Sequence, residues 1–150
     1  MKLDKDFLLE YLSTDSPSTY EVEAQDTWVK KVEPYCDIIE TDKYGNAIAV
    51  VLPSKSNTDY APTVVIDAHC DEIGWMVSDI TNDGYIQVKR NGGVDNELAP
   101  MTRVRIMTEN NGKVEGFFGW LPIHLKKGSG DPKATEDTIY IDVAATSKKE

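Results

Sequence analysis

The sequence lacks the features that build disulfide scaffolds and membrane spans. Its two cysteines, Cys36 and Cys70, lie far apart and form no CxxC pair, so a disulfide framework and a four-cysteine zinc site are excluded. No apolar run is long enough to cross a bilayer, and the charged residues 1–6 do not resemble a signal peptide. We therefore expect a cytoplasmic protein with no membrane partner.

Positive charge is also scarce. The 150 residues include 26 acidic and 16 basic side chains, which gives a net charge of −10. Such a surface repels phosphate backbones, which argues against a nucleic-acid partner. The length and the 40% hydrophobic content are sufficient for one globular domain or two small ones.

Helical periodicity is confined to the first third of the chain. Apolar residues at helical spacing predict a short helix over residues 4–12 and a second one from Val22 that ends near Pro34. Ser18 followed by Glu21 resembles a capping box at the start of the second helix. Residues 38–52 then predict a β-hairpin.

The next apolar run, residues 63–69, is rich in β-branched side chains. Such a run is typical of a central strand that is buried on both faces. Helices followed by this strand favour a layered α/β unit. Between residues 75 and 120 the pattern changes to short alternating strands with glycine bends, which favours a small closed barrel. A further strand is expected over residues 138–143, and residues 146–150 resemble a helix cap and first turn, which predicts that the polypeptide continues.

The sequence His69-Cys70-Asp71-Glu72 directly follows the predicted buried strand. In open α/β sheets, ligands and catalytic groups collect at the carboxyl ends of the strands. Because side chains alternate along an extended chain, His69 and Asp71 share a face. The imidazole can then bind a metal through one nitrogen while Asp71 accepts a hydrogen bond from the other. A His-x-Asp triplet alone is not specific, and the alternative is a histidine whose ring is satisfied by a neighbouring carboxylate.

The wider string, residues 64–74, closely resembles the AHxDEIG signature of the M42 family of aminopeptidases. Further pieces follow in that family's order and cover almost the whole chain: Ser16-Pro17-Ser18, Asp42 with Gly45-Asn46, Gly92-Gly93, Pro122 with His124, and Ile141-Asp142. Three positions depart from the pattern. Thr19 and Ala144 stand where glycine is usual, which puts the local backbone geometry in doubt, and Cys70 stands where methionine is frequent.

The resemblance implies an α/β fold: a partial layered α/β catalytic domain with an inserted PDZ-like β-barrel. Residues 1–74 would begin the catalytic domain, residues 75–137 would form the barrel, and residues 138–150 would return to the catalytic domain. In the family the barrel builds homo-oligomers that admit short peptides. The resemblance also implies that, without the rest of the catalytic domain, apolar surface around residues 64–66 and 139–143 would be exposed, which favours self-association.

The implied activity is that of an aminopeptidase with two divalent metal ions, zinc or cobalt. Carried over by position, His69 matches a metal ligand and Asp71 matches the carboxylate that orients it, while Glu72 receives no chemical role. The other ligands and the general base belong to family segments beyond Glu150. We therefore expect this chain alone to bind metal weakly or not at all and to have no peptidase activity.

Two other interpretations remain. The first is a non-catalytic α/β and PDZ-like module for protein association. The second is a related di-metal family of carboxypeptidases or deacylases, which the Asp-Glu-Ile-Gly string and the early barrel insertion disfavour. His124 is expected to be a surface histidine rather than a ligand.

Overall fold

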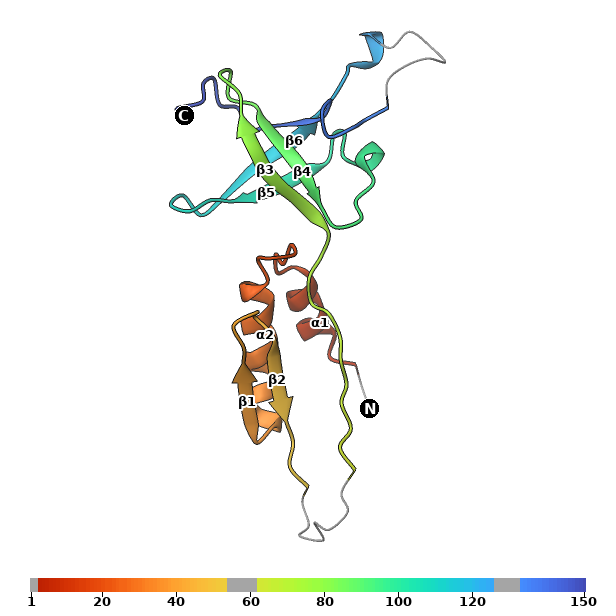
Figure 1. Cartoon of the computed structure of the whole chain (residues 1–150), viewed down its shortest axis with the longest axis vertical. Coiled ribbons are helices and arrows are strands. Elements are labelled where there is room, and N and C mark those ends of the chain that lie inside the picture. Colours follow the sequence, from red (N-terminus) through yellow and green to blue (C-terminus); the bar gives the residue numbers. More distant parts are fainter. Residues whose placement is uncertain (1–2, 54–61, 126–132) are drawn as a thin grey trace. The chain divides into compact units, whose positions relative to one another are not determined.

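The computed structural model describes residues 3–53, 62–125 and 133–150 (Figure 1). The chain divides into two compact units, residues 1–72 and 73–150. The first contains two helices and a hairpin, and the second contains a five-stranded antiparallel sheet. The fold is therefore mixed α/β. Neither α-helix in the described residues has the length and apolar content that crossing a bilayer requires.

Both predicted helices are present in the first unit. α1 spans Lys5–Leu12, and the Asp4 carboxylate caps it by accepting the Phe7 N–H at 3.1 Å. α2 spans Val22–Val32, and the chain leaves it through a 3-10 turn, Glu33–Tyr35, that contains Pro34.

The predicted capping box at Ser18 and Glu21 is wrong. The N-cap of α2 is Glu21 itself, and its side chain makes no capping hydrogen bond. The Glu21 carboxylate instead accepts the N–H of Thr19, and the Ser18 hydroxyl donates to Asp71. Ser18 lies too far ahead of the first helical residue to cap α2, because capping requires the side chain directly at the helix start.

The predicted hairpin is confirmed. β1 (Ile38–Thr41) and β2 (Ala47–Val50) pair antiparallel, with Ile38 opposite Val50. The Asp42 carboxylate accepts the N–H groups of Tyr44 and Asn46, which closes the connecting turn. β2 packs against α2.

The predicted buried strand at residues 63–69 is wrong in this structure. The segment is extended but belongs to neither sheet (Figure 1), and Val64, Val65 and Ile66 are 80%, 80% and 93% exposed. The predicted exposure of residues 64–66 is thereby confirmed. A strand buried on both faces needs partner strands beside it and further elements, such as helices, that cover both faces of the sheet. Within the described part of the first unit, β1 and β2 pair with each other and leave this segment without a partner strand.

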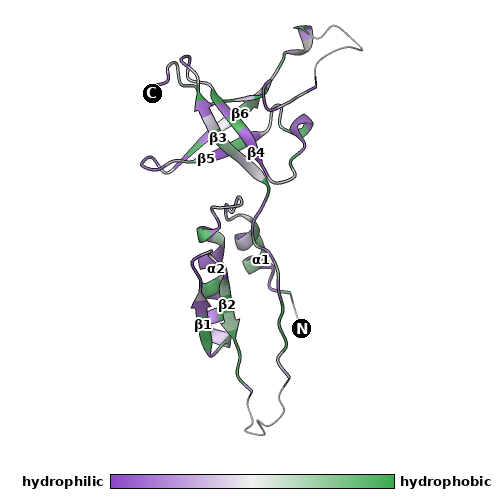
Figure 2. Cartoon of the chain, in the orientation of Figure 1, coloured by the Kyte–Doolittle hydropathy of each residue, from purple (hydrophilic) through white to green (hydrophobic). Residues whose placement is uncertain are grey.

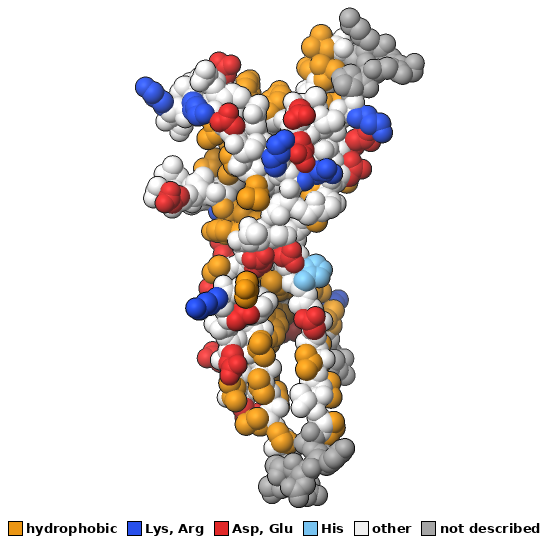
Figure 3. Space-filling model, in the orientation of Figure 1, with side chains coloured by type: hydrophobic (Ala, Val, Ile, Leu, Met, Phe, Trp, Pro, Cys, Tyr) orange, Lys and Arg blue, Asp and Glu red, His pale blue; other side chains and the backbone are white. Residues whose placement is uncertain are grey.

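The second unit is built from short strands, as expected. They are β3 (Gly74–Ile80), β4 (Ile86–Asn91), β5 (Arg103–Met107), β6 (Lys113–Gly119) and β7 (Tyr140–Asp142), in the order β3-β4-β7-β6-β5. Every pairing is antiparallel, and the sheet curls around its own core. Acidic, basic and hydrophobic side chains are interspersed over the visible surface of this unit (Figure 3).

The core of this unit surrounds Phe118, which is fully buried. The ring centroids of Trp75 and Phe118 lie 4.7 Å apart. Ile139 and Ile141 are also buried here, so the predicted exposure of residues 139–143 is wrong for these two side chains. Ile141 pairs with both Ile86 and Phe118, because β7 lies between β4 and β6. The strand expected to return to the catalytic domain thus completes the core of the second unit. The assignment of whole ranges to catalytic and PDZ-like domains stays a prediction.

The two positions at which glycine was expected both have a left-handed backbone. Thr19 has φ 77° and Ala144 has φ 64°. This conformation costs L-residues with a Cβ atom about 1–2 kcal/mol. The departures from the family pattern are therefore points of local strain.

Replacing Ala144 by glycine is expected to stabilise the second unit by about 0.5–1 kcal/mol, since relief of the strain outweighs the added unfolded-state entropy. Urea unfolding followed by tryptophan fluorescence measures the change. Ala134→Gly is the control, because Ala134 is buried and has no positive φ, and its loss of a packed methyl group should destabilise the unit. Equal destabilisation by both changes would contradict the prediction.

Candidate metal-ligand site

The segment that contains His69 is held in place by the loop of residues 16–18. The Glu72 N–H donates to the Ser16 carbonyl at 2.8 Å, and the Ser18 N–H donates to the Glu72 carbonyl at 3.2 Å. The Ser16 hydroxyl donates to the Cys70 carbonyl at 3.0 Å. The Ser16 N–H donates to the Glu72 carboxylate at 3.0 Å. Glu72, which had no assigned role, therefore joins the two segments.

Asp71 is fixed from two sides. The Ser18 hydroxyl donates to one carboxylate oxygen, and His69 Nδ1 lies 3.0 Å from the other. The Ser18 hydroxyl, followed by the His69 ring, lowers the pKa of Asp71 below its ordinary value. Asp71 is therefore ionised at neutral pH, and its carboxylate is suited to accept a hydrogen bond from an imidazole N–H.

The structure brings the predicted pair together. His69 Nδ1 also lies 3.1 Å from the Asp71 carbonyl, and the His69 side chain is 85% exposed. When Nδ1 carries the proton of these bonds, the neutral ring presents the lone pair of Nε2 outward. Nε2 has no hydrogen-bond partner among the residues that the structure describes. The ring is thus accessible rather than enclosed in apolar packing, although no sheet edge surrounds it.

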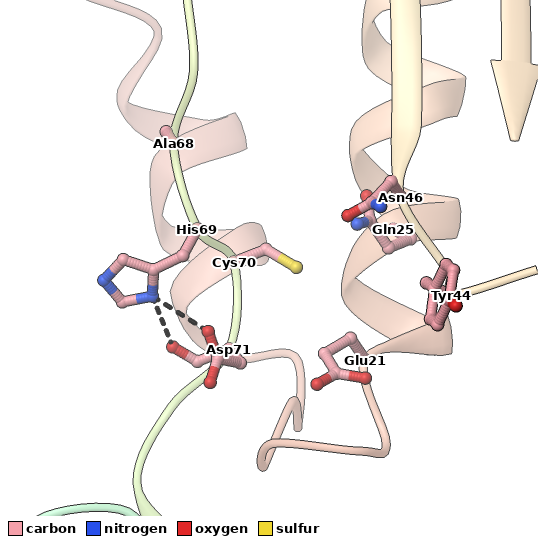
Figure 4. Close-up of a pocket in the computed structure, with 9 residues that line it drawn as sticks. Glu21, Gln25, Tyr44, Asn46, Ala68, His69, Cys70 and Asp71 are labelled. Carbon is pink, nitrogen blue, oxygen red and sulfur yellow. Dashed lines mark hydrogen bonds and ion pairs between the residues drawn. The ribbon is translucent and has the colours of Figure 1, made fainter. Parts of the chain in front are cut away.

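A cavity of about 140 Å³ lies beside this segment (Figure 4). It is lined by Glu21 and Gln25 of the helix start, by residues 44–46 of the hairpin turn and by residues 68–71. The Cys70 sulfur points into it, on the other side of the backbone from the imidazole (Figure 4). Burial raises the pKa of the Cys70 thiol, so it stays protonated and is a poor metal ligand.

His69 fits one position of a metal site, with an exposed nitrogen and a carboxylate that orients its ring. Within residues 3–53, 62–125 and 133–150, no group of three or more His, Cys, Asp or Glu side chains is placed to hold an ion. Catalytic zinc sites use three protein ligands. The described residues therefore do not by themselves make up such a site. His124 lies exposed in the 3-10 turn Ile123–Leu125 of the second unit.

Replacing Ser18 by alanine is expected to raise the pKa of Asp71 toward its ordinary value, because the largest contribution to its lowering is lost. A depressed folded-state pKa stabilises the fold above the unfolded pKa, and this contribution is lost as the pH falls through the folded value. Carboxyl-carbon NMR titration measures the shift. Ser13→Ala serves as the control, since the Ser13 hydroxyl donates to the Leu9 carbonyl. An unchanged Asp71 titration in Ser18→Ala would contradict the assignment.

Comparison with known proteins identifies the family. Residues 45–150 match the M42 glutamyl aminopeptidase family. The chain is 34% identical over 151 residues to the lysyl aminopeptidase of Pyrococcus furiosus, which covers 99% of this chain and 42% of the relative. Its fold matches a TET aminopeptidase from a marine sediment thaumarchaeote with a TM-score of 0.85 and 25% identity, over 97% of this chain and 39% of the other.

A third similar structure is the TET1 peptidase of Pyrococcus horikoshii, which can assemble into a tetrahedron or a large octahedral shell. It matches with a TM-score of 0.79 and 25% identity, over 97% of this chain and 42% of that protein. This chain thus spans about two fifths of the length of the relatives that it matches. With most of its residues inside the family match, the chain belongs to the M42 family of glutamyl aminopeptidases.

Proposed function

We propose that residues 1–150 are part of a metal-dependent aminopeptidase that removes N-terminal residues from short peptides. The observation that carries the proposal is the exposed His69 ring, oriented by the Asp71 carboxylate, in a chain of this family. The lysyl aminopeptidase that is 34% identical to the chain supports the same class of reaction.

Each residue of the pair has a distinct task. Two divalent cations, zinc or cobalt, would supply polarisation of the scissile carbonyl. His69 would bind one of them through Nε2, since Nδ1 is directed to Asp71. Asp71 fixes the tautomer of the ring and raises its basicity, and the Ser18 hydroxyl holds Asp71 in that position. The general base and the remaining ligands lie outside residues 1–150.

The test compares the 150-residue chain with the full product of its gene, each supplied with zinc or cobalt and a panel of aminoacyl substrates. We expect no release of N-terminal residues by the 150-residue chain and clear release by the full product. His69→Ala should abolish that release, whereas His124→Ala, at another exposed histidine, should retain it.

Two results contradict the proposal. Hydrolysis by the 150-residue chain that is lost in His69→Ala would show that these residues suffice for catalysis. A metal-loaded full product without activity on any substrate would favour the second candidate, a non-catalytic α/β and PDZ-like module for protein association. The small number of candidate ligands in the described residues is what keeps that candidate open.

We also propose that the second unit is a PDZ-like barrel through which copies of the protein associate. The assembly of the Pyrococcus horikoshii TET1 peptidase supports association in this family. The strand residues Met76 and Phe117 are each 55% exposed, which provides apolar contact area.

A further inference from the structure

The backbone after His69 is joined to the loop between α1 and α2 by an isolated parallel bridge, between Pro17 and Glu72. Its two backbone bonds run from the Glu72 N–H to the Ser16 carbonyl and from the Ser18 N–H to the Glu72 carbonyl. In the described part of the first unit, no further pair of residues extends this bridge into a ladder. Short pairs of strands are marginally stable in water, so side-chain bonds are needed to fix the register of this bridge.

The Glu72 side chain supplies such a bond. The chain is hydrophobic over residues 64–66 and becomes hydrophilic at Asp71 and Glu72, shortly before β3 (Figure 2). One Glu72 carboxylate oxygen accepts the Ser16 N–H at 3.0 Å, and Ser16 is only 6% exposed. A buried N–H that loses its partner is costly, because water does not replace the bond. The Glu72 carboxylate therefore holds Ser16 in place, and with it the register of the bridge.

This register places the Ser18 hydroxyl on Asp71. Ser18 lies directly after the bridge, and its hydroxyl donates to the Asp71 carboxylate, whose other oxygen lies 3.0 Å from His69 Nδ1. A continuous series of contacts thus runs from the Glu72 carboxylate through Ser16 and Ser18 to Asp71 and the imidazole ring.

The backbone after Ser18 is strained. Thr19 has a left-handed conformation with φ 77°, and its N–H donates to the Glu21 carboxylate. Such strain persists only where the surrounding structure fixes it, and strained residues cluster at functional sites. The loop is therefore held in one particular conformation, and that conformation directs Ser18 to Asp71.

We propose that Glu72 is a positioning residue for the metal-ligand pair: its carboxylate fixes the loop of residues 16–18, and the Ser18 hydroxyl of that loop holds Asp71 in the orientation that sets the His69 tautomer. This inference rests on the proposed function. Glu72 acts through these residues and not on the cation or the substrate. Its role requires an oxygen acceptor at the reach of a glutamate side chain, and does not require a negative charge.

Variants of residue 72 separate this role from a catalytic one. Glu72→Gln keeps an oxygen acceptor at the same reach, whereas Glu72→Asp keeps the charge on a side chain that is shorter by a methylene group. In the full product of the gene, supplied with zinc, we expect kcat on aminoacyl substrates to fall about 10-fold or more in Glu72→Ala and Glu72→Asp. It should fall by less than about threefold in Glu72→Gln, which makes a neutral and weaker bond, and KM should stay the same in all three.

Glu40→Ala, at an exposed glutamate of β1 in the same unit, is the matched control and should keep full activity. Loss of all activity in Glu72→Gln with activity retained in Glu72→Asp would overturn the proposal, since the charge would then act on the cation or the substrate.

The tautomer of His69 tests the same link without any activity. Nitrogen NMR of the 150-residue chain, at a pH where the ring is neutral, shows whether Nδ1 or Nε2 carries the proton. We expect the Nδ1–H form to dominate in the unchanged chain and in Glu72→Gln, and to lose its dominance in Glu72→Ala and Ser18→Ala. The double variant of Glu72 and Ser18 should match the single ones, because the first residue acts through the second. Additive changes would overturn this route.

Hydrogen exchange at the Ser16 amide reports the bond to Glu72 directly, and it should be faster in Glu72→Ala and Glu72→Asp than in Glu72→Gln. If Glu72→Ala does not fold, the comparison of Glu72→Gln with Glu72→Asp carries both tests. The expected tautomers together with an inactive full product would support the inference and contradict the proposed function. An unchanged tautomer in every variant of residue 72 would overturn the inference and leave the proposed function standing.

Discussion

Phe118→Ala is expected to destabilise the second unit by about 3–5 kcal/mol. Phe118 is 0% exposed and lies at the centre of the core cluster, in contact with the ring of Trp75. The substitution removes a whole ring from the cluster that Phe118 forms with buried side chains of β4 and β7. The strands cannot close the cavity because their backbones are held by pairing. A unit of this size has only about 5–15 kcal/mol of total stability, so a large part of it is lost.

Phe117→Ala is the matched control, since Phe117 is the next residue on β6 and is 55% exposed on the other face of the strand. Its loss should cost less than about 1 kcal/mol. Urea unfolding reports both changes through Trp75 and Trp120, which lie in the second unit. Similar losses for the two phenylalanines would show that the core is not where the structure places it.

The elements that the sequence predicted well are those whose formation depends on nearby residues. The spacing of apolar residues predicts α1 and α2, and the turn residues predict the β1–β2 hairpin. All three elements are present at the expected places. The proximity of His69 and Asp71 also follows from local geometry, because alternation of side chains requires an extended backbone and not a paired one.

The errors arise where a residue's state depends on distant partners. Residues 64–66 have the composition of a buried strand, but composition does not supply the neighbouring strands, and in this structure the segment is exposed. The Ser18–Glu21 spacing suggested a helix cap, whereas the Ser18 hydroxyl is used by Asp71, which is distant in sequence. The expected exposure of residues 139–143 is wrong at Ile139 and Ile141 for the same reason, because both side chains pack in the core of the second unit.

The sequence does not predict the contact between residues 16–18 and residues 70–72, although both segments belong to one family pattern. Motif order along a chain does not show which motifs meet. Thr19 and Ala144, at positions where the family has glycine, give a more direct prediction of structure than motif order does. A preference for glycine indicates a left-handed backbone, and both residues have positive φ.

Gly84→Ala is expected to destabilise the second unit by about 2–4 kcal/mol, through backbone strain and a steric clash together. Gly84 has φ 86° in the turn between β3 and β4, and a Cβ atom there would lie 2.7 Å from the Ala145 carbonyl oxygen. That neighbour is backbone and cannot rotate away. The clash would displace residues near Ala145, and with them the hydrogen bond from the Lys148 N–H to the Asn82 carbonyl at 3.2 Å.

Gly112→Ala separates the two causes. Gly112 also has positive φ, at 67°, in the turn between β5 and β6 of the same unit, but a Cβ atom there meets nothing within 4 Å. This change should therefore cost only the strain of about 1–2 kcal/mol. Urea unfolding of both variants, with hydrogen exchange at the Lys148 amide, should show the larger loss and faster exchange in Gly84→Ala alone. Equal losses without faster exchange would mean that the residues after β7 do not pack against the β3–β4 turn, since strain would then explain the whole effect.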